Sequence, residues 1–194
     1  TKMSVSELKK EGMEAEEETA FLPTLPVFME EEEVREGGTS RGTAYHRAME
    51  LLPFSQITSE EEVTRLLNQY TEEGKLAKEA RDMIWPSDIY RFFTTKLGKR
   101  MQAAAQSGKL YKEKQFVMGI PAREMGDWDS DELVLIQGII DAWFEEEDGL
   151  ILVDYKTDYV NDAQILVKRY KTQLDYYEKA LTQMLGRNVK ERYI

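Results

Sequence analysis

Cysteine is absent from this chain of 194 residues. A structural disulfide, a thiolate-bound metal and an iron–sulfur cluster are therefore excluded, because each of them needs cysteine sulfur. Long hydrophobic runs are also missing: no apolar stretch approaches the ~20 residues of a membrane-spanning helix, and the first residues lack the apolar segment of a signal peptide. These absences predict a soluble, intracellular protein that has no membrane association.

Runs of basic residues are scarce as well. The formal net charge is −11, and residues 1–36 carry much of it, with eleven acidic and four basic side chains. The clearest cationic clusters, "KLGKRMQ" and "VKRYK", are short. Binding to nucleic acid draws much of its affinity from lysine and arginine side chains that neutralise phosphates. The composition therefore argues against tight binding of nucleic acid by this chain alone.

The length favours one domain preceded by an arm. Residues 1–38 include the charge run "MEEEEVREGG" and are predicted to be an acidic arm or linker. Residues 39–194 are predicted to form the folded domain. Because the chain starts at Thr1 and ends in what looks like the beginning of a strand, we expect a fragment of a longer protein.

Hydrophobic periodicity and capping signals predict the order of the elements. Helices are expected over residues 42–52, 59–73 and 89–106, with Gly98 as a candidate interruption of the third. Strands follow over 109–122, 133–145 and 150–157, then a helix over 161–185 capped by Asn161 or Asp162, and a strand over 189–194. This order predicts a mixed α/β, α+β-like fold in which a central mixed sheet with a meander is flanked by helices.

Three charged residues stand in the predicted hairpin "QGIIDAWFEEEDGLILVDYKTD": Asp141, Asp154 and Lys156. With a two-residue loop at Asp148–Gly149, Asp141 lies opposite Lys156. With the loop at Glu147–Asp148, Asp141 faces Asp154 directly. Either register puts all three groups on one face of the sheet, because side chains of paired residues share a face.

Two adjacent carboxylates stay ionised together only if a cation lies between them. Oxygen ligands suit Mg²⁺, and Lys156 would point at the same place to position a water and neutralise charge on a phosphate. The arrangement is that of a metal-dependent nuclease. The alternative for Asp154 and Lys156 is a structural salt bridge, but the flanking runs "LILV" and "LVLIQGII" are apolar enough for strands buried on both faces.

Five motifs in order extend this pattern over about residues 39–181. They are "GTAYH", a strand glutamate at Glu113, "GIID", "DYKT" and "YKTQLDYY", the last of which joins a Gln-Leu pair to a following tyrosine. This series resembles the RecB-type nucleases of the PD-(D/E)XK superfamily, which have a restriction-endonuclease-like core. Within that family, "VREGGTSRGTAYHRAME" and "YKEKQFVMGIPA" are most similar to the carboxyl-terminal nuclease domain of AddA-type helicase–nucleases.

The resemblance implies roles for particular residues. Asp141, Asp154, the backbone carbonyl of Tyr155 and His46 would bind Mg²⁺, or Mn²⁺ in its place. Lys156 would be the catalytic lysine, supported in the site by the catalytic pair Gln173 and Tyr177. Members of this superfamily that bind an iron–sulfur cluster do so through four cysteines, so the chain resembles the branch without a cluster.

Several of these residues have simpler interpretations. The single histidine, His46, lies among apolar neighbours and is by itself typical of a satisfied helix histidine. Tyr177 continues a helical stripe with Tyr170 and Leu174 and is compatible with the core. Glu113 is compatible with a supporting position at the site or with a structural ion pair, and the sequence does not decide between them.

The expected function is hydrolysis of phosphodiester bonds in DNA, with a single strand delivered by a helicase portion of the same polypeptide. The resemblance further implies double-strand break repair and recombination as the process, a bacterial, cytoplasmic, nucleoid-associated location, and a partner in the form of a second helicase–nuclease subunit. The alternatives are a stand-alone exonuclease of the same family, which would need a basic groove of its own, and a non-catalytic module that binds DNA or a partner.

Overall fold

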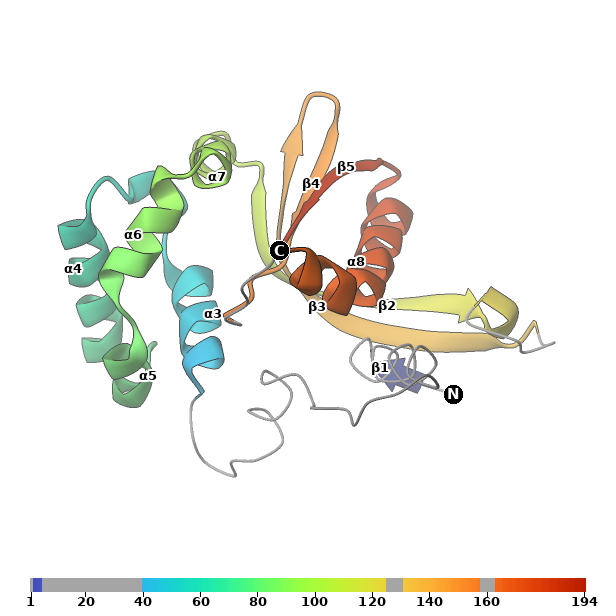
Figure 1. Ribbon diagram of the computed structural model, residues 1–194, viewed down its shortest axis with the longest axis horizontal. Coiled ribbons are helices and arrows are strands. Elements are labelled where there is room, and N and C mark those ends of the chain that lie inside the picture. The colour runs from blue at the N-terminus through green and yellow to red at the C-terminus, as the bar shows by residue number, and fades with distance from the viewer. Residues whose placement is uncertain (1, 5–39, 125–130, 158–162) are drawn as a thin grey trace.

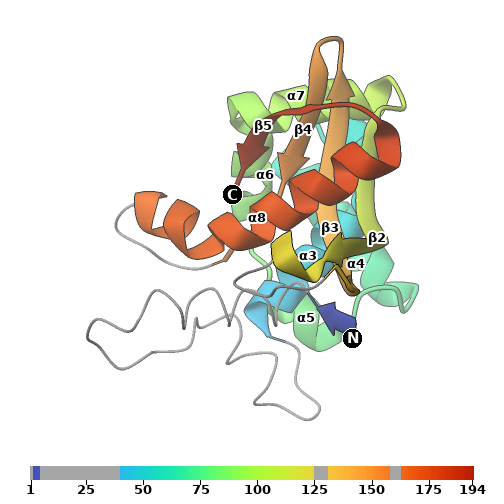
Figure 2. The same cartoon turned by 90° about the vertical axis from the view of Figure 1, so that its right-hand side faces the viewer.

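A central sheet separates two groups of helices in the computed structural model, which describes residues 2–4, 40–124, 131–157 and 163–194 (Figure 1). Helix α8 (Ala163–Leu185) covers one face of the sheet, and helices α3 to α7 lie on the other side (Figures 1 and 2). The predicted mixed α/β fold with flanking helices is confirmed.

The sheet has five strands built around a three-stranded meander. Strands β2 (Leu110–Pro121), β3 (Leu133–Glu146) and β4 (Gly149–Val153) pair antiparallel in chain order. Strand β5 (Val189–Tyr193) then joins β4 in parallel, which makes the sheet mixed. The meander and the last strand agree with the sequence prediction. The three-residue strand β1 (Lys2–Ser4), parallel to β3, was not predicted, because so short a segment shows no periodicity.

The helices on the α3 side agree in part with the predicted start and stop signals. Their bounds are α3 (Arg41–Leu51), α4 (Glu60–Glu72), α5 (Lys78–Met83), α6 (Pro86–Thr94) and α7 (Lys96–Gln106). The Ser59 hydroxyl caps α4 by accepting the N–H of Glu62 at 3.1 Å, as its capping-box spacing predicts. The short helix α5 was not predicted. The predicted caps of α8, Asn161 and Asp162, lie outside the described residues.

The prediction of one helix over residues 89–106 was wrong, because α6 and α7 are separate helices. The break is at Thr95, whose backbone is extended. Its hydroxyl accepts the N–H of Gly98 at 3.0 Å and thereby caps α7. The interruption therefore lies one turn before Gly98. The glycine has a different role, because its missing side chain lets α7 approach the end of α6 closely.

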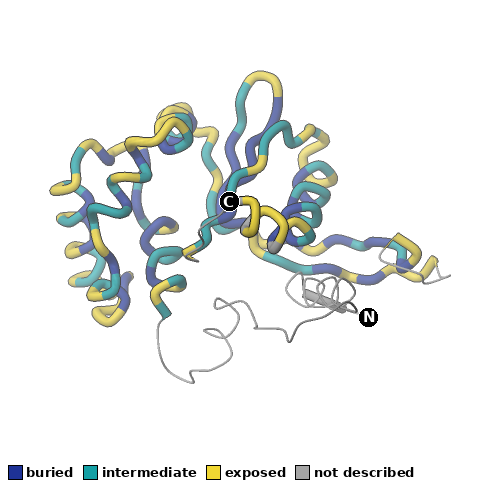
Figure 3. The backbone as a smooth tube through the Cα atoms, in the orientation of Figure 1, coloured by how far each residue is buried: buried dark blue, intermediate teal, exposed yellow. Residues whose placement is uncertain are grey.

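Strand β4 lies at the centre of the core. All five of its residues are buried, as expected for a strand covered on both faces, and the core runs as a dark band through Figure 3. Ile151 and Val153 pack toward the α3–α7 helices, whereas Leu150 and Leu152 pack toward α8. Within the described part of the chain, no helix combines the length and apolar character needed to cross a membrane.

The contact between α6 and α7 predicts an unusual effect of a glycine substitution. A Cβ atom on Gly98 would lie 2.2 Å from the carbonyl oxygen of Phe92 and 2.8 Å from Cα of Phe93. Gly98→Ala should therefore lower the free energy of unfolding by about 1–3 kcal/mol, the usual cost of overpacking, although alanine is the better helix former. Chemical denaturation measures the change.

Gly119→Ala is the matched control, since its Cβ would meet only Leu133 side-chain atoms at 3.5–3.8 Å. A Gly98→Ala variant as stable as this control would show that the two helices can separate without cost.

Candidate active site

Two buried carboxylates meet where the β3–β4 hairpin leaves the sheet. The strands are joined by the two-residue loop Glu147–Asp148, and their paired residues run from Glu146–Gly149 to Ala142–Val153. This is the second of the two predicted registers, and its next pair would be Asp141 and Asp154. Their exposed fractions are 8% and 2%. The register thus brings the two acids together and removes both from water.

The chain turns out of the sheet directly after Val153, so the predicted strand over 150–157 was too long. The backbone N–H of Tyr155 donates to Oδ2 of Asp141 at 2.8 Å. This hydrogen bond ties the departing segment to β3. The carbonyl of Tyr155 then lies 2.9 Å from Nε2 of His46, on the α3 side of the sheet.

His46 contacts two acceptors at once. Its Nε2 lies near the Tyr155 carbonyl, and its Nδ1 lies 3.3 Å from Oδ1 of Asp141. The Tyr155 carbonyl can only accept, so Nε2 carries the proton of that hydrogen bond, and the Asp141 carboxylate favours a proton on Nδ1 as well. Burial by itself would lower the pKa of His46, but the hydrogen bond and the charge of Asp141 outweigh it and raise the pKa. Both contacts therefore favour the protonated form of His46.

The contact between His46 and Asp141 also affects the ionisation of Asp141. Burial alone would raise the pKa of this carboxyl. The hydrogen bond and charge of His46, the charge of Lys156 and the N–H of Tyr155 act in the opposite direction and lower the pKa. Of the two facing acids, Asp141 is therefore the one whose pKa is lowered.

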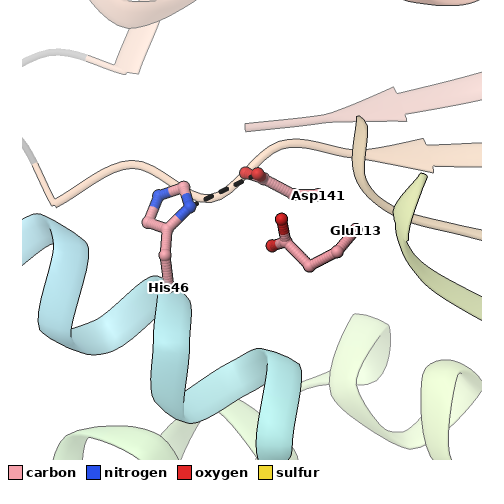
Figure 4. Close-up of side chains that lie close together, drawn as sticks. All are labelled: His46, Glu113 and Asp141. Atoms are coloured by element: carbon pink, nitrogen blue, oxygen red, sulfur yellow. Dashed lines mark ion pairs between the residues drawn. The ribbon is translucent and has the colours of Figure 1, made fainter. Parts of the chain in front are cut away.

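Glu113 reaches the site through an unusual backbone conformation. Its φ is 51°, in the left-handed region that side-chain-bearing residues rarely adopt, although its neighbours on both sides pair regularly with β3. Ligand atoms of Glu113, His46 and Asp141 all lie within 4.8 Å of one another (Figure 4). Burial and the charge of Asp141 raise the pKa of Glu113 to about 7. The sequence left this glutamate undecided, and the structure places it at the site.

Asp154 and Lys156 form a second, deeper pair. Nζ of Lys156 lies 2.7 Å from Oδ2 of Asp154, and only 5% and 2% of the two side chains are exposed. The two side chains are therefore in direct ionic contact. Burial, reinforced by Asp141 and opposed by Lys156, raises the pKa of Asp154 to about 6.

Helix α8 supports Lys156 from the opposite face of the sheet. Oε1 of Gln173 accepts from Lys156 Nζ at 3.3 Å, and Nε2 of Gln173 donates to the Tyr177 hydroxyl at 2.8 Å. The ring of Tyr177 also packs edge-on against Phe116, in the core. Burial raises the pKa of Tyr177. The two interpretations of Tyr177, core residue and site residue, are therefore both compatible with its contacts.

Lys112 is a supporting residue that the sequence analysis missed. Its Nζ donates to the carbonyl oxygens of Met49 and Leu52, at 3.0 and 2.7 Å, and thereby holds the end of α3 against β2. Burial lowers its pKa to about 8. The only signal in the sequence was a lysine next to Glu113 in an otherwise alternating strand.

The residues present fit a divalent cation. Ligand atoms of His46, Glu113 and Asp141 converge, and the carbonyl oxygen of Tyr155 lies next to the other ring nitrogen of His46. The group offers mainly oxygen ligands with one imidazole. Carboxylate and carbonyl oxygens suit Mg²⁺ and Mn²⁺, and imidazole suits transition metals. Asp154 borders this group but is paired with Lys156 here.

The comparisons with known proteins agree with this geometry. The family profile of the PD-(D/E)XK nuclease superfamily matches residues 19–194. An ATP-dependent helicase/nuclease subunit of Lachnoclostridium phytofermentans is 39% identical over 217 residues, covering 92% of this chain. The corresponding helicase/nuclease protein of Clostridium botulinum strain Langeland is 39% identical over 205 residues, covering the whole chain.

The chain spans only a small part of these relatives. The aligned region covers 16% of the length of each. The family match covers all of the folded part from α3 to β5, and with it every residue of the site described above. This chain therefore belongs to the PD-(D/E)XK nuclease superfamily and is similar to the nuclease region of ATP-dependent helicase/nuclease proteins.

Proposed function

We propose that this chain is a Mg²⁺-dependent nuclease domain that hydrolyses phosphodiester bonds in DNA, with Mn²⁺ able to replace Mg²⁺. One observation carries the proposal: ligand atoms of His46, Glu113 and Asp141 lie within 4.8 Å of one another, beside the buried Asp154–Lys156 pair. Membership of a nuclease superfamily supports the reaction class. The donor set supports the dependence on a metal.

A divalent cation held by these ligands would supply positive charge to the scissile phosphate and make a water more acidic. The residues of the chain perform the remaining tasks. The N–H of Tyr155 orients the Asp141 carboxylate. Lys156 faces the same site and positions the attacking water or a phosphate oxygen. Gln173 acts as a positioning residue, because it accepts from the Lys156 ammonium and is itself held by Tyr177.

The charge distribution favours DNA that is delivered as a single strand. In the cationic cluster "KLGKRMQ", the guanidinium of Arg100 forms ion pairs with the carboxylates of Glu146 and Glu191, at 2.8 and 2.7 Å. In "VKRYK", Lys171 is paired with Asp175. Because these cations are already paired with acids, we infer that a helicase portion of the longer polypeptide feeds the strand to the site, beside a second subunit, during double-strand break repair and recombination.

This inference predicts weak autonomous binding. At physiological salt the isolated chain should bind single-stranded DNA more weakly than about 10⁻⁶ M, the tighter end of non-specific binding. Fluorescence anisotropy with a labelled oligonucleotide in the presence of EDTA measures the affinity. Nanomolar binding would contradict delivery by an attached motor and favour a stand-alone exonuclease.

Lys156→Met should reduce cleavage of single-stranded DNA by about 10²-fold or more, the usual loss when a group that acts in the transition state is removed. Asp154→Asn should have a similar effect. Gel analysis of an end-labelled oligonucleotide in Mg²⁺ measures the rates. Lys171→Met is the matched control, since it removes a lysine of α8 whose side chain is 65% exposed. Cleavage at the parental rate by a folded Lys156→Met variant would refute the assignment.

Cation binding should compete with protons. The pKa of His46 is raised, and that of Glu113 is about 7, so at pH 6 these two ligands are largely protonated. Mn²⁺ affinity should therefore rise from pH 6 to pH 8, by about tenfold per pH unit for each proton released. Calorimetry in two buffers of different ionisation enthalpy counts the protons.

Glu113→Gln and Asp141→Asn test the ligand assignment in the same titration. Both should weaken Mn²⁺ binding strongly, whereas Glu61→Gln, an exposed acid of α4, should leave it unchanged. Affinity that is equal at pH 6 and pH 8, or insensitive to Asp141→Asn, would show that the cation binds elsewhere.

A further inference from the structure

A pocket of 260 Å³ lies next to the site, between α3, α6 and the segment that follows β4. The three elements contribute its walls: Arg41, Tyr45 and Met49 from α3, Asp88, Ile89 and Phe92 from α6, and Tyr155, Lys156 and Thr157 from the segment. Lys156 is thus shared between the pocket and the catalytic group. A ligand in the pocket would lie beside the phosphate that the site acts on.

Helix α3 contributes residues to both the pocket and the catalytic group, from two different faces. Its pocket residues, Arg41, Tyr45 and Met49, are spaced four apart and therefore lie along one stripe. His46 follows Tyr45 but points to Asp141 and the Tyr155 carbonyl. One helix consequently fixes the position of the pocket relative to the catalytic group.

Aromatic rings form much of the pocket lining. Tyr45, Phe92 and Tyr155 contribute rings from all three elements. The rings of Phe92 and Tyr155 contact each other edge to face, with centroids 6.1 Å apart. Aromatic surfaces of this kind bind nucleic-acid bases through stacking, with little dependence on the base.

Hydrogen bonds hold the polar side of the pocket in place. The Tyr45 hydroxyl donates to Oδ2 of Asp88 at 3.0 Å and accepts the backbone N–H of Trp85 at 3.0 Å. Arg41 lies 3.5 Å from the same Asp88 oxygen, with 60% of its side chain exposed. The lining therefore has a fixed acceptor in its wall and a cation that reaches solvent.

The Asp88 carboxylate determines which part of a nucleotide fits in the pocket. A phosphate placed against Asp88 would be repelled, whereas the N–H groups of a base could donate to it. Arg41 can meet the phosphates of the strand outside the pocket. The volume of the pocket lies below the usual range of small-molecule sites, about 300–1,000 Å³. A pocket of this size suits one base and not a base pair.

We infer that this pocket binds one unstacked base of a DNA single strand, the base of a nucleotide next to the phosphate at Lys156. The inference rests on the proposed nuclease function. It adds how the site would recognise a single strand of DNA. A paired base would have to leave its duplex to enter the pocket, at a cost in pairing and stacking. The pocket thus selects single-stranded substrate at the site of reaction.

The first test is binding without a metal. Saturation-transfer NMR with deoxyadenosine monophosphate in EDTA should show transfer to the base protons, and 2-deoxyribose 5-phosphate should show none. Thr157→Trp should abolish the transfer, because Thr157 is exposed and its replacement can fill the pocket without entering the core. Arg41→Ala should weaken binding by about threefold, the scale of an exposed cation–π or charge contact.

Arg91→Ala is the matched control. Arg91 also lies near Asp88, at 3.4 Å, and 75% of its side chain is exposed, but it does not line the pocket. This variant should bind the nucleotide as the parent does. Absence of transfer in the parent chain, or transfer that persists in a folded Thr157→Trp variant, would overturn the inference.

The second test separates the pocket from the chemistry. In Mg²⁺, a single-stranded oligonucleotide with one abasic site should be cut about tenfold or more slowly at a bond beside that site, given about 1–3 kcal/mol per stacked base. Uniform cutting along the strand would overturn the pocket and leave the nuclease function intact. No cutting of any strand, with nucleotide binding retained, would support the pocket and refute the proposed function.

Discussion

The burial of two facing carboxylates imposes the main constraint on this structure. Asp141 and Asp154 are almost completely removed from water at the end of the β3–β4 hairpin. Two like charges in such a place are unfavourable unless cations or donors compensate them. The structure supplies different partners to each: His46 and the Tyr155 N–H to Asp141, and Lys156 to Asp154.

Helix α3 and strand β2 are linked by the same requirement. The imidazole ring of His46 contacts the Asp141 carboxylate and the Tyr155 carbonyl, two groups that a metal ion would also bind. Lys112 anchors the end of the helix that carries His46, and its neighbour Glu113 adds a third carboxyl. A protonated histidine in this position stabilises the acidic cluster and leaves an arrangement that a divalent cation can take over.

The segment after β4 connects the reaction site to its surroundings. The side chain of Lys156 contacts Asp154 and Gln173, and the residue also lines the aromatic pocket. The same helix, α3, contributes to both the acidic cluster and the pocket wall. A substrate strand that reaches the cluster would therefore meet aromatic surfaces within the same rigid frame. The overall acidity of the chain and the pairing of Arg100 leave the wider surface poorly suited to hold a duplex.

The order of the main elements followed from the sequence, and the charged hairpin indicated where the candidate site lies. Alternation and apolar runs identified the meander, because a strand buried on both faces shows up as "LILV" interrupted by charge. Tertiary structure decided what local patterns could not. Only the loop at Glu147–Asp148 put Asp141 opposite Asp154, only the positive φ of Glu113 turned its carboxyl toward His46, and only the packing of α3 against α6 formed the pocket. These features depend on contacts between residues far apart in the chain, on which spacing along the sequence carries no information.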